Sequence, residues 1–579
     1  MNLKNKLPKS IVLVKFKIIL YTTLILSAIA SEVKAQSPSL FDFSGQIGLF
    51  YDTYGYSEEN YPTFRPKYPD NLLRFSANAT IRAGKYFSMP FGIDITNQKS
   101  SYYLPTLPEE RFIDYIQNPR NNISFNPTYK WAKAFLGTQT PSYSPLTTGD
   151  IPIFGLGIEL TPGRFLFSLN YGKSQIGINP SPFENIAGAF EQWMLASRIG
   201  VGKEDGTKFV MQFVKLTDEV SSINTNPNRL QPQEAITISP LLQIRLAKQW
   251  LISTELATSV YTEDVLGPGS VSDNEIVSLA ENLITINGTS HADISNITAL
   301  EWKSDAASVG AEVRYVGAGF QSVGYRTTER DLIDYNLKTS LKLLKNKVIF
   351  TGSTGVRTNN LSNTTMESTN RFIANVNLYT QLSKVVSVNT SYSNFGFRNN
   401  VVFDTLKVEM IQNMFSIAPT LQFDRKSINH IVTTSGSFQF FDEYNMYDGK
   451  TISTVSKTLN MGYTLVFKNF PLTTGIMGLL LDNETPQSQL NLYNIGINAR
   501  YRFFDKKLTP SIMLAYSGIE RDDETPDKRT RFTLKSDYKL TKKLNFRMSY
   551  TWSNYKYGST RPDALTNEHR LQFSVAQRF

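Results

Sequence analysis

The chain has 579 residues, of which 41% are hydrophobic, 12% aromatic and 19% charged, and it contains no cysteine. This composition is too aromatic and too weakly charged for a disordered chain, and too polar on average for a bundle of membrane helices. Without cysteine there can be no disulfide framework, thiolate metal site, cysteine nucleophile or lipid-modified N-terminal cysteine.

The N-terminus has the pattern of a secretory signal peptide. Residues 1–17 carry five lysines and no acid, and an apolar run of 13 residues, 18–30, follows. A membrane anchor would need about 20 apolar residues. Because Val33-Lys34-Ala35 provides an acceptable small-residue cleavage site, we predict a signal peptide at 1–35 and a mature chain at 36–579.

The mature chain alternates hydrophobic and polar residues from its start. The pattern is clear over 41–52, 73–82 and 545–552, and it persists to the last residue. A period of two is that of a β-strand. We therefore predict an all-β chain.

Short and long connections alternate between the predicted strands. The short ones are tight turns such as Ala83-Gly84-Lys85 and Lys345-Asn346-Lys347. The longer polar segments are 97–122, 173–190, 217–232, 262–294, 358–370 and 555–566. Short periplasmic turns at one rim and long extracellular loops at the other are typical of a transmembrane antiparallel β-barrel. The spacing predicts a single large barrel of about 26 strands, with about 24 as the alternative, an even number as such barrels have.

The first predicted strand follows the signal peptide closely, so we expect no N-terminal plug domain. The tryptophans support the barrel. Trp131, Trp250 and Trp302 fall next to short turns, whereas Trp193 and Trp552 fall near the long-loop ends of their strands. Amphipathic rings prefer the level of the lipid headgroups, so these positions predict two aromatic girdles.

The last strand ends the chain on an aromatic residue. Phe573, Val575 and Phe579 share the apolar parity of this strand. The arrangement resembles the C-terminal signal by which bacterial outer-membrane proteins engage their barrel-assembly machinery. We therefore predict that machinery as a partner, together with outer-membrane lipid and lipopolysaccharide.

Two blocks of sequence resemble a family. The first comprises Asn126-Pro127-Thr128-Tyr129-Lys130-Trp131, Tyr143-Ser144-Pro145, the stretch 155–165 and Tyr171-Gly172. The second comprises Arg314-Tyr315, the stretch 319–325, Asp331, Lys345-Asn346-Lys347, Gly355, Asn360-Leu361, Arg371 and Tyr392-Ser393-Asn394-Phe395. Together they are similar to an uncharacterised family of outer-membrane β-barrel proteins of the Bacteroidota. The resemblance implies the fold and the bacterial cell outer membrane, and it assigns no catalytic or binding residue.

The sequence offers little for catalysis. Of three histidines, His291 lies in a predicted long loop, and His430 and His569 lie on the predicted lipid-facing parity. None has the spacing of a metal site or a catalytic triad, and no glycine-rich stretch has the strand and helix of a phosphate loop. We therefore predict no enzymatic activity, no cofactor and no metal.

The net charge is +10, but five of the lysines belong to residues 1–17. The mature protein is then too weakly basic to suggest a nucleic-acid partner.

Basic residues recur on the predicted lumen-facing parity of the C-terminal strands. This candidate basic wall comprises Arg500, Arg502, Arg529, Arg531, Lys535, Arg547, Arg570 and Arg578. Facing lipid, each Arg or Lys would cost about 2 to 4 kcal/mol at mid-membrane. In an open lumen the wall would favour anions. If loops fold inward, the same residues would instead form ordinary internal ion pairs.

A barrel of this size would leave a wide channel unless something fills it. We expect inward-folded loops such as 97–122 and 262–294, or a partner protein, to occlude it. The leading hypothesis is a channel or transporter for polar and, given the arginines, anionic solutes. The alternative is a non-enzymatic structural or assembly component that docks surface or periplasmic partners, for which the aromatic segment 97–122 is a candidate surface.

Overall fold

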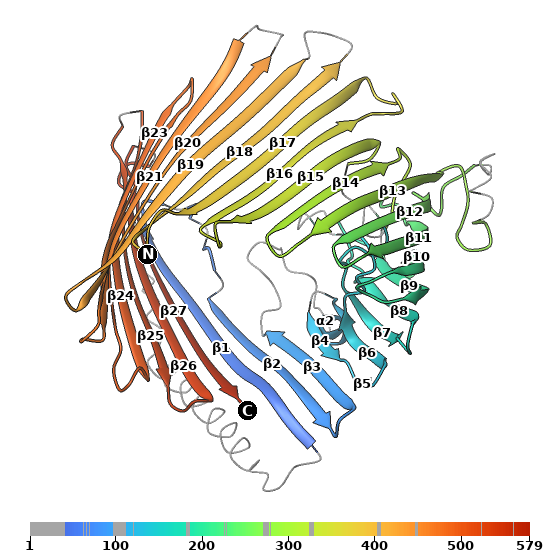
Figure 1. Cartoon of the computed structure of the whole chain (residues 1–579), viewed down its shortest axis with the longest axis horizontal. Helices are drawn as coiled ribbons and strands as arrows, with labels where there is room; N and C mark the ends of the chain where they lie inside the picture. The colour runs from blue at the N-terminus through green and yellow to red at the C-terminus, as the bar shows by residue number, and fades with distance from the viewer. Residues whose placement is uncertain are drawn as a thin grey trace.

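The computed structural model of the chain is a closed antiparallel β-barrel, whose ring of strands is seen in Figure 1. The structure describes residues 41–579 except 62, 65, 69, 97–111, 120, 181–185, 225, 227–228, 270–276, 278–279, 323–328, 402–406, 446–449, 523 and 560. The predicted signal peptide, 1–35, lies outside the described residues.

The first and last strands close the barrel. β1 (Phe41–Glu59) pairs on one side with β2 (Asn71–Ala83) and on the other with β27 (Leu565–Arg578). Its register with β27 runs from Gln46 opposite Arg578 to Glu59 opposite Leu565. Closure pairs the backbone groups that an open sheet would leave exposed at its two edges.

The 27 described strands make a 26-stranded barrel, because two short ones share one place in the wall. β4 (Asn122–Phe125) and β5 (Thr128–Tyr129) both lie between β3 (Phe87–Thr96) and β6 (Ala132–Gln139). Pro127, which lacks a backbone N–H, falls between them. The predicted all-β fold and strand number are confirmed.

The remaining strands follow one another around the wall. In the first half they are β7 (Ile153–Leu160), β8 (Phe165–Gln175), β9 (Glu191–Gly202), β10 (Lys208–Glu219), β11 (Glu234–Leu246), β12 (Trp250–Thr262), β13 (Ser290–Lys303) and β14 (Ala307–Val316). In the second half they are β15 (Leu332–Leu343), β16 (Val348–Asn359), β17 (Glu367–Gln381), β18 (Val386–Val401), β19 (Val408–Arg425), β20 (Ile428–Asn445), β21 (Lys450–Phe467), β22 (Leu472–Glu484), β23 (Gln489–Tyr501), β24 (Leu508–Arg521), β25 (Asp527–Lys539) and β26 (Leu544–Lys556).

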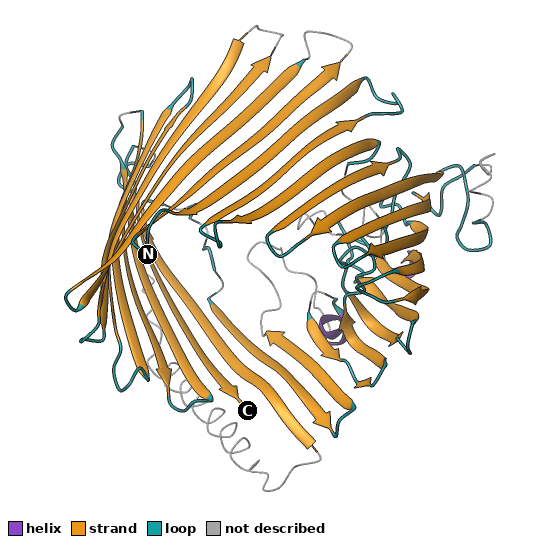
Figure 2. Ribbon diagram, viewed as in Figure 1, coloured by secondary structure: helices purple, strands orange, loops and turns teal. Residues whose placement is uncertain are grey.

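Helix is scarce in the part of the chain that the structure describes, as Figure 2 shows. It comprises α2 (Phe112–Gln117) and the 3-10 helix η2 (Val220–Ser222). Neither these nor any other described helix has the length and apolar character needed to cross a bilayer.

The two rims of the barrel differ in their connections. At one rim, the short-turn rim, every connection has two to six residues. At the other, the long rim, connections of eleven residues or more occur between β1 and β15, whereas those after β15 have four to eight residues. The predicted long loop at 358–370 is shorter in the structure, because β16 and β17 leave only 360–366 between them.

The outer face carries exposed apolar side chains at alternate strand positions. Leu156, Ile199, Leu480 and Ile497 have exposed fractions of 63, 52, 57 and 54%. Such a wall is stable against lipid rather than water, so this is a membrane β-barrel.

The histidines lie in strands. His430 and His569 are on the outer face, as expected, and their Nδ1 atoms lie 2.7 and 2.8 Å from the Tyr463 and Tyr550 hydroxyls. His291, expected in a loop, is instead the second residue of β13.

Described residues of the connection between β12 and β13 cover the outside of the wall. Val277, Ala280 and Ile284 pack on Ile236 and Val260. Ile236 and Val260 alternate with inward-facing neighbours and share the parity of the lipid-facing residues in β11 and β12. The expectation that 262–294 folds into the lumen is therefore wrong for its described part, because the apolar side chains of this segment find an apolar surface on the outer wall.

Candidate functional site

A hollow of about 760 Å³ lies against the inner face of β22 to β27. We call it the basic hollow, after its six basic lining residues Lys67, Arg500, Arg529, Arg531, Lys535 and Arg570. Glu568 is the acidic residue among its described lining residues. A concave, one-signed surface of this kind concentrates counter-ions.

Strand alternation and register bring these residues together. Arg529, Arg531 and Lys535 occupy odd positions of β25, so all three point inward. Arg500 lies two strands away in the same row as Lys535, because each pairs with Ser511 of β24. Distant sequence positions thus meet on one wall.

Four of the six basic residues are left without an acid. Arg570 donates from Nε to Asp52 Oδ1 at 3.0 Å, and Lys67 lies 2.7 Å from Glu568. The four residues that make no ion pair with any carboxylate that the structure describes are Arg500, Arg529, Arg531 and Lys535. Arg529 instead donates a hydrogen bond to the Ser553 hydroxyl at 3.3 Å. The hollow therefore keeps uncompensated positive charge.

The rest of the predicted basic wall lies outside the hollow. Arg547 pairs with Asp537 at 2.9 Å, and Arg578 donates to the Gln46 side chain at 3.2 Å. Arg502 follows β23 in the turn at the short-turn rim. The predicted set thus divides into residues that line the hollow and residues that are paired or at the rim.

Sequence reasoning missed Lys67 and Tyr68, which come from the connection between β1 and β2. Tyr68 lies under the Arg570 guanidinium, with 3.6 Å between its ring centroid and Cζ. No periodic signal marks these residues. Their contacts fold this connection over the hollow.

The opposite side of the lumen is filled by residues 140–152, between β6 and β7, which we call the inner segment. Ser144 donates to Glu255 at 2.5 Å, and Thr147 donates to Gln212 Oε1 at 3.0 Å. Ser239 also donates to Glu255, at 2.7 Å. The buried carboxylate of β12 thus holds the inner segment with neutral donors.

Apolar contacts complete this packing. Leu146 is fully buried with Ala257, Val316 and Phe320, the last from the connection between β14 and β15. On the other side of the segment, Met194 of β9 is also fully buried. The parts of the inner faces of β8 to β12 that lie toward the long rim are thereby closed to solvent.

Tyr143 anchors the same segment. Its hydroxyl donates to Ser168 at 3.0 Å and accepts a hydrogen bond from Asn170 at 2.6 Å. Burial raises the pKa of Tyr143 above its ordinary value, although the bonds from Ser168 and Asn170 act in the other direction. The ring therefore stays neutral.

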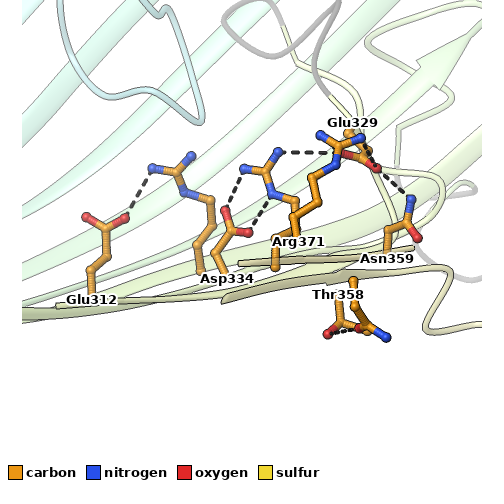
Figure 3. Close-up of polar contacts among 9 residues, drawn as sticks. Glu312, Glu329, Asp334, Thr358, Asn359 and Arg371 are labelled. Atoms are coloured by element: carbon orange, nitrogen blue, oxygen red, sulfur yellow. Dashed lines mark hydrogen bonds and ion pairs between the residues drawn. The ribbon is translucent and has the colours of Figure 1, made fainter. Parts of the chain in front are cut away.

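A balanced row of charges lies along β14 to β17, and Figure 3 shows its polar contacts. Arg314, Asp334, Arg357 and Arg371 are register neighbours across β14 to β17. Arg357 Nε lies 2.6 Å from Asp334, and Arg371 Nη1 lies 3.1 Å from Glu329. This row forms ordinary internal ion pairs, unlike the basic hollow.

The other predicted occluding loop, 97–122, lies partly outside the described residues, at 97–111 and 120. Its described helix α2 bridges two parts of the wall. The Thr96 N–H donates to the Tyr115 hydroxyl at 2.9 Å, and Lys173 Nζ donates to Gln117 Oε1 at 3.0 Å.

Throughout the described residues, no group of His, Cys, Asp and Glu could hold a metal ion.

The predicted girdle residues lie near the two rims. Trp250 and Trp302 are register partners beside short turns, with ring centroids 6.3 Å apart, and Trp131 lies in such a turn. Trp193 and Trp552 lie near the long-rim ends of β9 and β26.

The predicted assembly signal lies at the barrel closure. Phe579 stacks on Phe43 at 4.3 Å and exchanges backbone hydrogen bonds with Gly45. Phe573 and Val575 lie opposite Tyr51 and Leu49 of β1.

Comparison with protein-family models and with curated proteins gives no match. The resemblance to Bacteroidota barrel proteins therefore stays a prediction. Solved structures similar to this chain include the P pilus usher (PapC) translocation pore, at 9% identity over 93% of this chain and 99% of that chain, with a TM-score of 0.35.

Others are Acinetobacter baumannii OccAB2, at 8% identity over 60% and 92% of the two chains, and the Pseudomonas aeruginosa outer membrane protein OpdK, at 8% over 60% and 94%. Both have a TM-score of 0.29. At these values the likeness carries no argument about function, and the barrel rests on the strand register of this chain.

Proposed function

We propose that this protein is a non-enzymatic channel or transporter for anionic solutes in the bacterial outer membrane. The observation that carries the proposal is the imbalance in the basic hollow, where Glu568 and the neighbouring Asp52 compensate two of the six basic residues and four remain uncompensated. A low-dielectric wall raises the local concentration of anions beside such a surface. In this proposal the short-turn rim is periplasmic and the long rim is extracellular.

The charges and contacts in the rest of the lumen also support a channel for anionic solutes. The three arginines of the row from Arg314 to Arg371 are compensated by three acids, Glu312, Asp334 and Glu329, so the row adds little net field. The inner segment closes the other side by neutral and apolar contacts. Solutes would therefore pass along the wall formed by β23 to β27.

The proposal is tested by the reversal potential of the purified protein in a planar bilayer under a salt gradient. We expect anion preference in the parent protein and its loss or reversal when Arg500, Arg531 and Lys535 are all changed to Glu. Lys345→Glu, in a short turn, makes the same kind of charge change outside the hollow and should leave the preference unchanged. Unchanged selectivity in the triple variant would refute the proposal.

We also propose that the C-terminal strand, through Phe573, Val575 and Phe579, engages the barrel-assembly machinery, and that lipid and lipopolysaccharide surround the outer face. Support for the first comes from the place of Phe579 at the closure of the barrel. The exposed apolar outer wall supports the second.

A further inference from the structure

A row of aromatic side chains leads from the long rim to the basic hollow. We call it the aromatic path, and its members in order are Tyr557, Tyr61, Phe64, Tyr56, Tyr54 and Tyr68. Successive ring centroids lie 5.2, 5.5, 4.9, 6.0 and 5.4 Å apart. The path is thus a continuous series of ring contacts between one rim and the lumen.

The path is continuous with the charged surface. Arg561 lies over the Tyr61 ring at 4.1 Å, and Arg570 lies over the Tyr68 ring at 3.6 Å. Tyr54 and Tyr68 themselves line the basic hollow. One guanidinium group therefore lies over a ring near each end of the aromatic path.

The spacing of the cations favours a ligand with several anionic groups. Arg529 and Arg531 are neighbouring inward positions of β25, about 7 Å apart along the strand, and Lys535 is two such steps beyond Arg531. Arg500 and Arg570 flank this line. A small monovalent anion would use one of these groups at a time.

The aromatic rings add a second requirement. Tyr56 and Tyr68 remain 39 and 38% exposed. Tyrosine offers a flat apolar face with a polar edge, which matches the C–H face and hydroxyl rim of a pyranose ring. Arginine binds carboxylate and other oxyanions through paired N–H groups.

We propose that the aromatic path and the basic hollow together bind acidic oligosaccharides, chains of sugar rings that carry carboxylate or sulfate groups. This inference rests on the channel function proposed above and narrows its solute. A neutral sugar would use the rings alone, and an inorganic polyanion would use the cations alone. An acidic oligosaccharide uses both.

The test is block of the single-channel current by three probes added at the long rim: tetragalacturonate, maltotetraose and inorganic tripolyphosphate. We expect tetragalacturonate to block at the lowest concentration. Changing both Tyr56 and Tyr68 to Ala should weaken its block about tenfold or more, which corresponds to about 1.4 kcal/mol. Tyr56→Ala alone, which leaves the lining of the basic hollow intact, should leave tripolyphosphate block and anion preference unaltered.

Two further variants keep the test decisive. Tyr56→Ala alone removes an exposed ring and should weaken tetragalacturonate block even if the double variant fails to fold. Tyr335→Ala removes a more exposed ring, 52%, from the outer face and should have no effect.

The outcomes separate this inference from the proposed function. Equal block by tetragalacturonate and tripolyphosphate, with no effect of the tyrosine changes, would overturn the acidic oligosaccharide site while the anion preference stands. Absence of anion preference in the parent protein would overturn both.

Discussion

The inner faces of β8 to β12 and of β23 to β27 have the same strand geometry and opposite surroundings. In the first, Met194, Ala196 and Val214 are closed off by the inner segment. In the second, Arg500, Arg531 and Lys535 face an open hollow. One barrel thus has a filled side and an open side, and the connections that fold inward determine which part of the lumen is filled.

The energetics of the two sides differ accordingly. Burial of apolar side chains stabilises the filled side, at roughly 25 cal/mol for each Å² removed from water. On the open side, uncompensated cations repel one another and are kept solvated by the lumen. Substitutions should therefore affect stability on the filled side and selectivity on the open side.

Replacing residues 142–150 with a short Gly-Ser linker should have the largest effect of the changes considered, and the effect is on single-channel conductance. The filled side would lose the part of the chain that closes it, so we expect a severalfold rise in single-channel conductance. The measurement is the conductance in a planar bilayer. An unchanged conductance would show that the inner segment does not limit the pathway.

Leu146→Ala should destabilise the filled side by about 3 kcal/mol, because the side chain is fully buried and leaves a cavity. Thermal unfolding in detergent, followed by circular dichroism, measures the loss. The control is Leu480→Ala on the outer face, where the side chain is 57% exposed and a smaller change is expected. Equal effects would contradict the packing described for Leu146.

Glu255→Ala should cost about 2 kcal/mol, because it removes the common acceptor of Ser144 and Ser239 in a buried place. The same unfolding experiment applies. Combining it with Ser144→Ala should cost less than the sum of the two single changes, because both remove one interaction. Strict additivity would mean that the two side chains act independently.

Glu329→Gln should have a modest effect, below about 1 kcal/mol, because its ion pairs with Arg357 and Arg371 are partly exposed. It also frees positive charge between the two sides. We expect a small rise in anion preference, read from the reversal potential. A shift toward cations would contradict the assignment of this row to the lumen.

Substitution of Glu204, in the turn between β9 and β10, should have the smallest effect on stability. Burial acts to raise its pKa, but the nearby Arg198 and Lys208 outweigh burial and lower the pKa below its ordinary value of 4.5. Its stabilisation is therefore present above pH 4.5 and is lost as the pH falls through the lower value of the folded state. Glu204→Gln should slightly reduce the loss of melting temperature at acid pH. An unchanged dependence of the melting temperature on pH would contradict the pairing of Glu204 with Arg198 and Lys208.

The fold and part of the candidate site could be predicted from the sequence. Alternation is a local property, so it predicted the strands, their number and the inward parity of Arg529, Arg531 and Lys535. It did not predict which connections fold inward, because that depends on contacts between distant segments. From the sequence we expected 262–294 to fold into the lumen, whereas in the structure 140–152 enters it.

A usable signal for the filled side was nevertheless present. In β10, Phe209 and Met211 face outward, yet Val210 and Val214 on the opposite parity are also apolar. A strand that is apolar on both faces indicates packing inside the barrel as well as lipid outside. Lys67 and Tyr68 had no such signal, since they lie in a connection without periodicity.

The absence of cysteine allows the central claim, a filled side and an open side, to be tested by single-cysteine labelling. Ser549→Cys places a thiol in the basic hollow, and Ala196→Cys places one beneath the inner segment, where the native side chain is fully buried. An anionic methanethiosulfonate reagent should modify the first rapidly and reduce the current, and should leave the second unmodified. Comparable labelling at the two positions would contradict the division of the lumen.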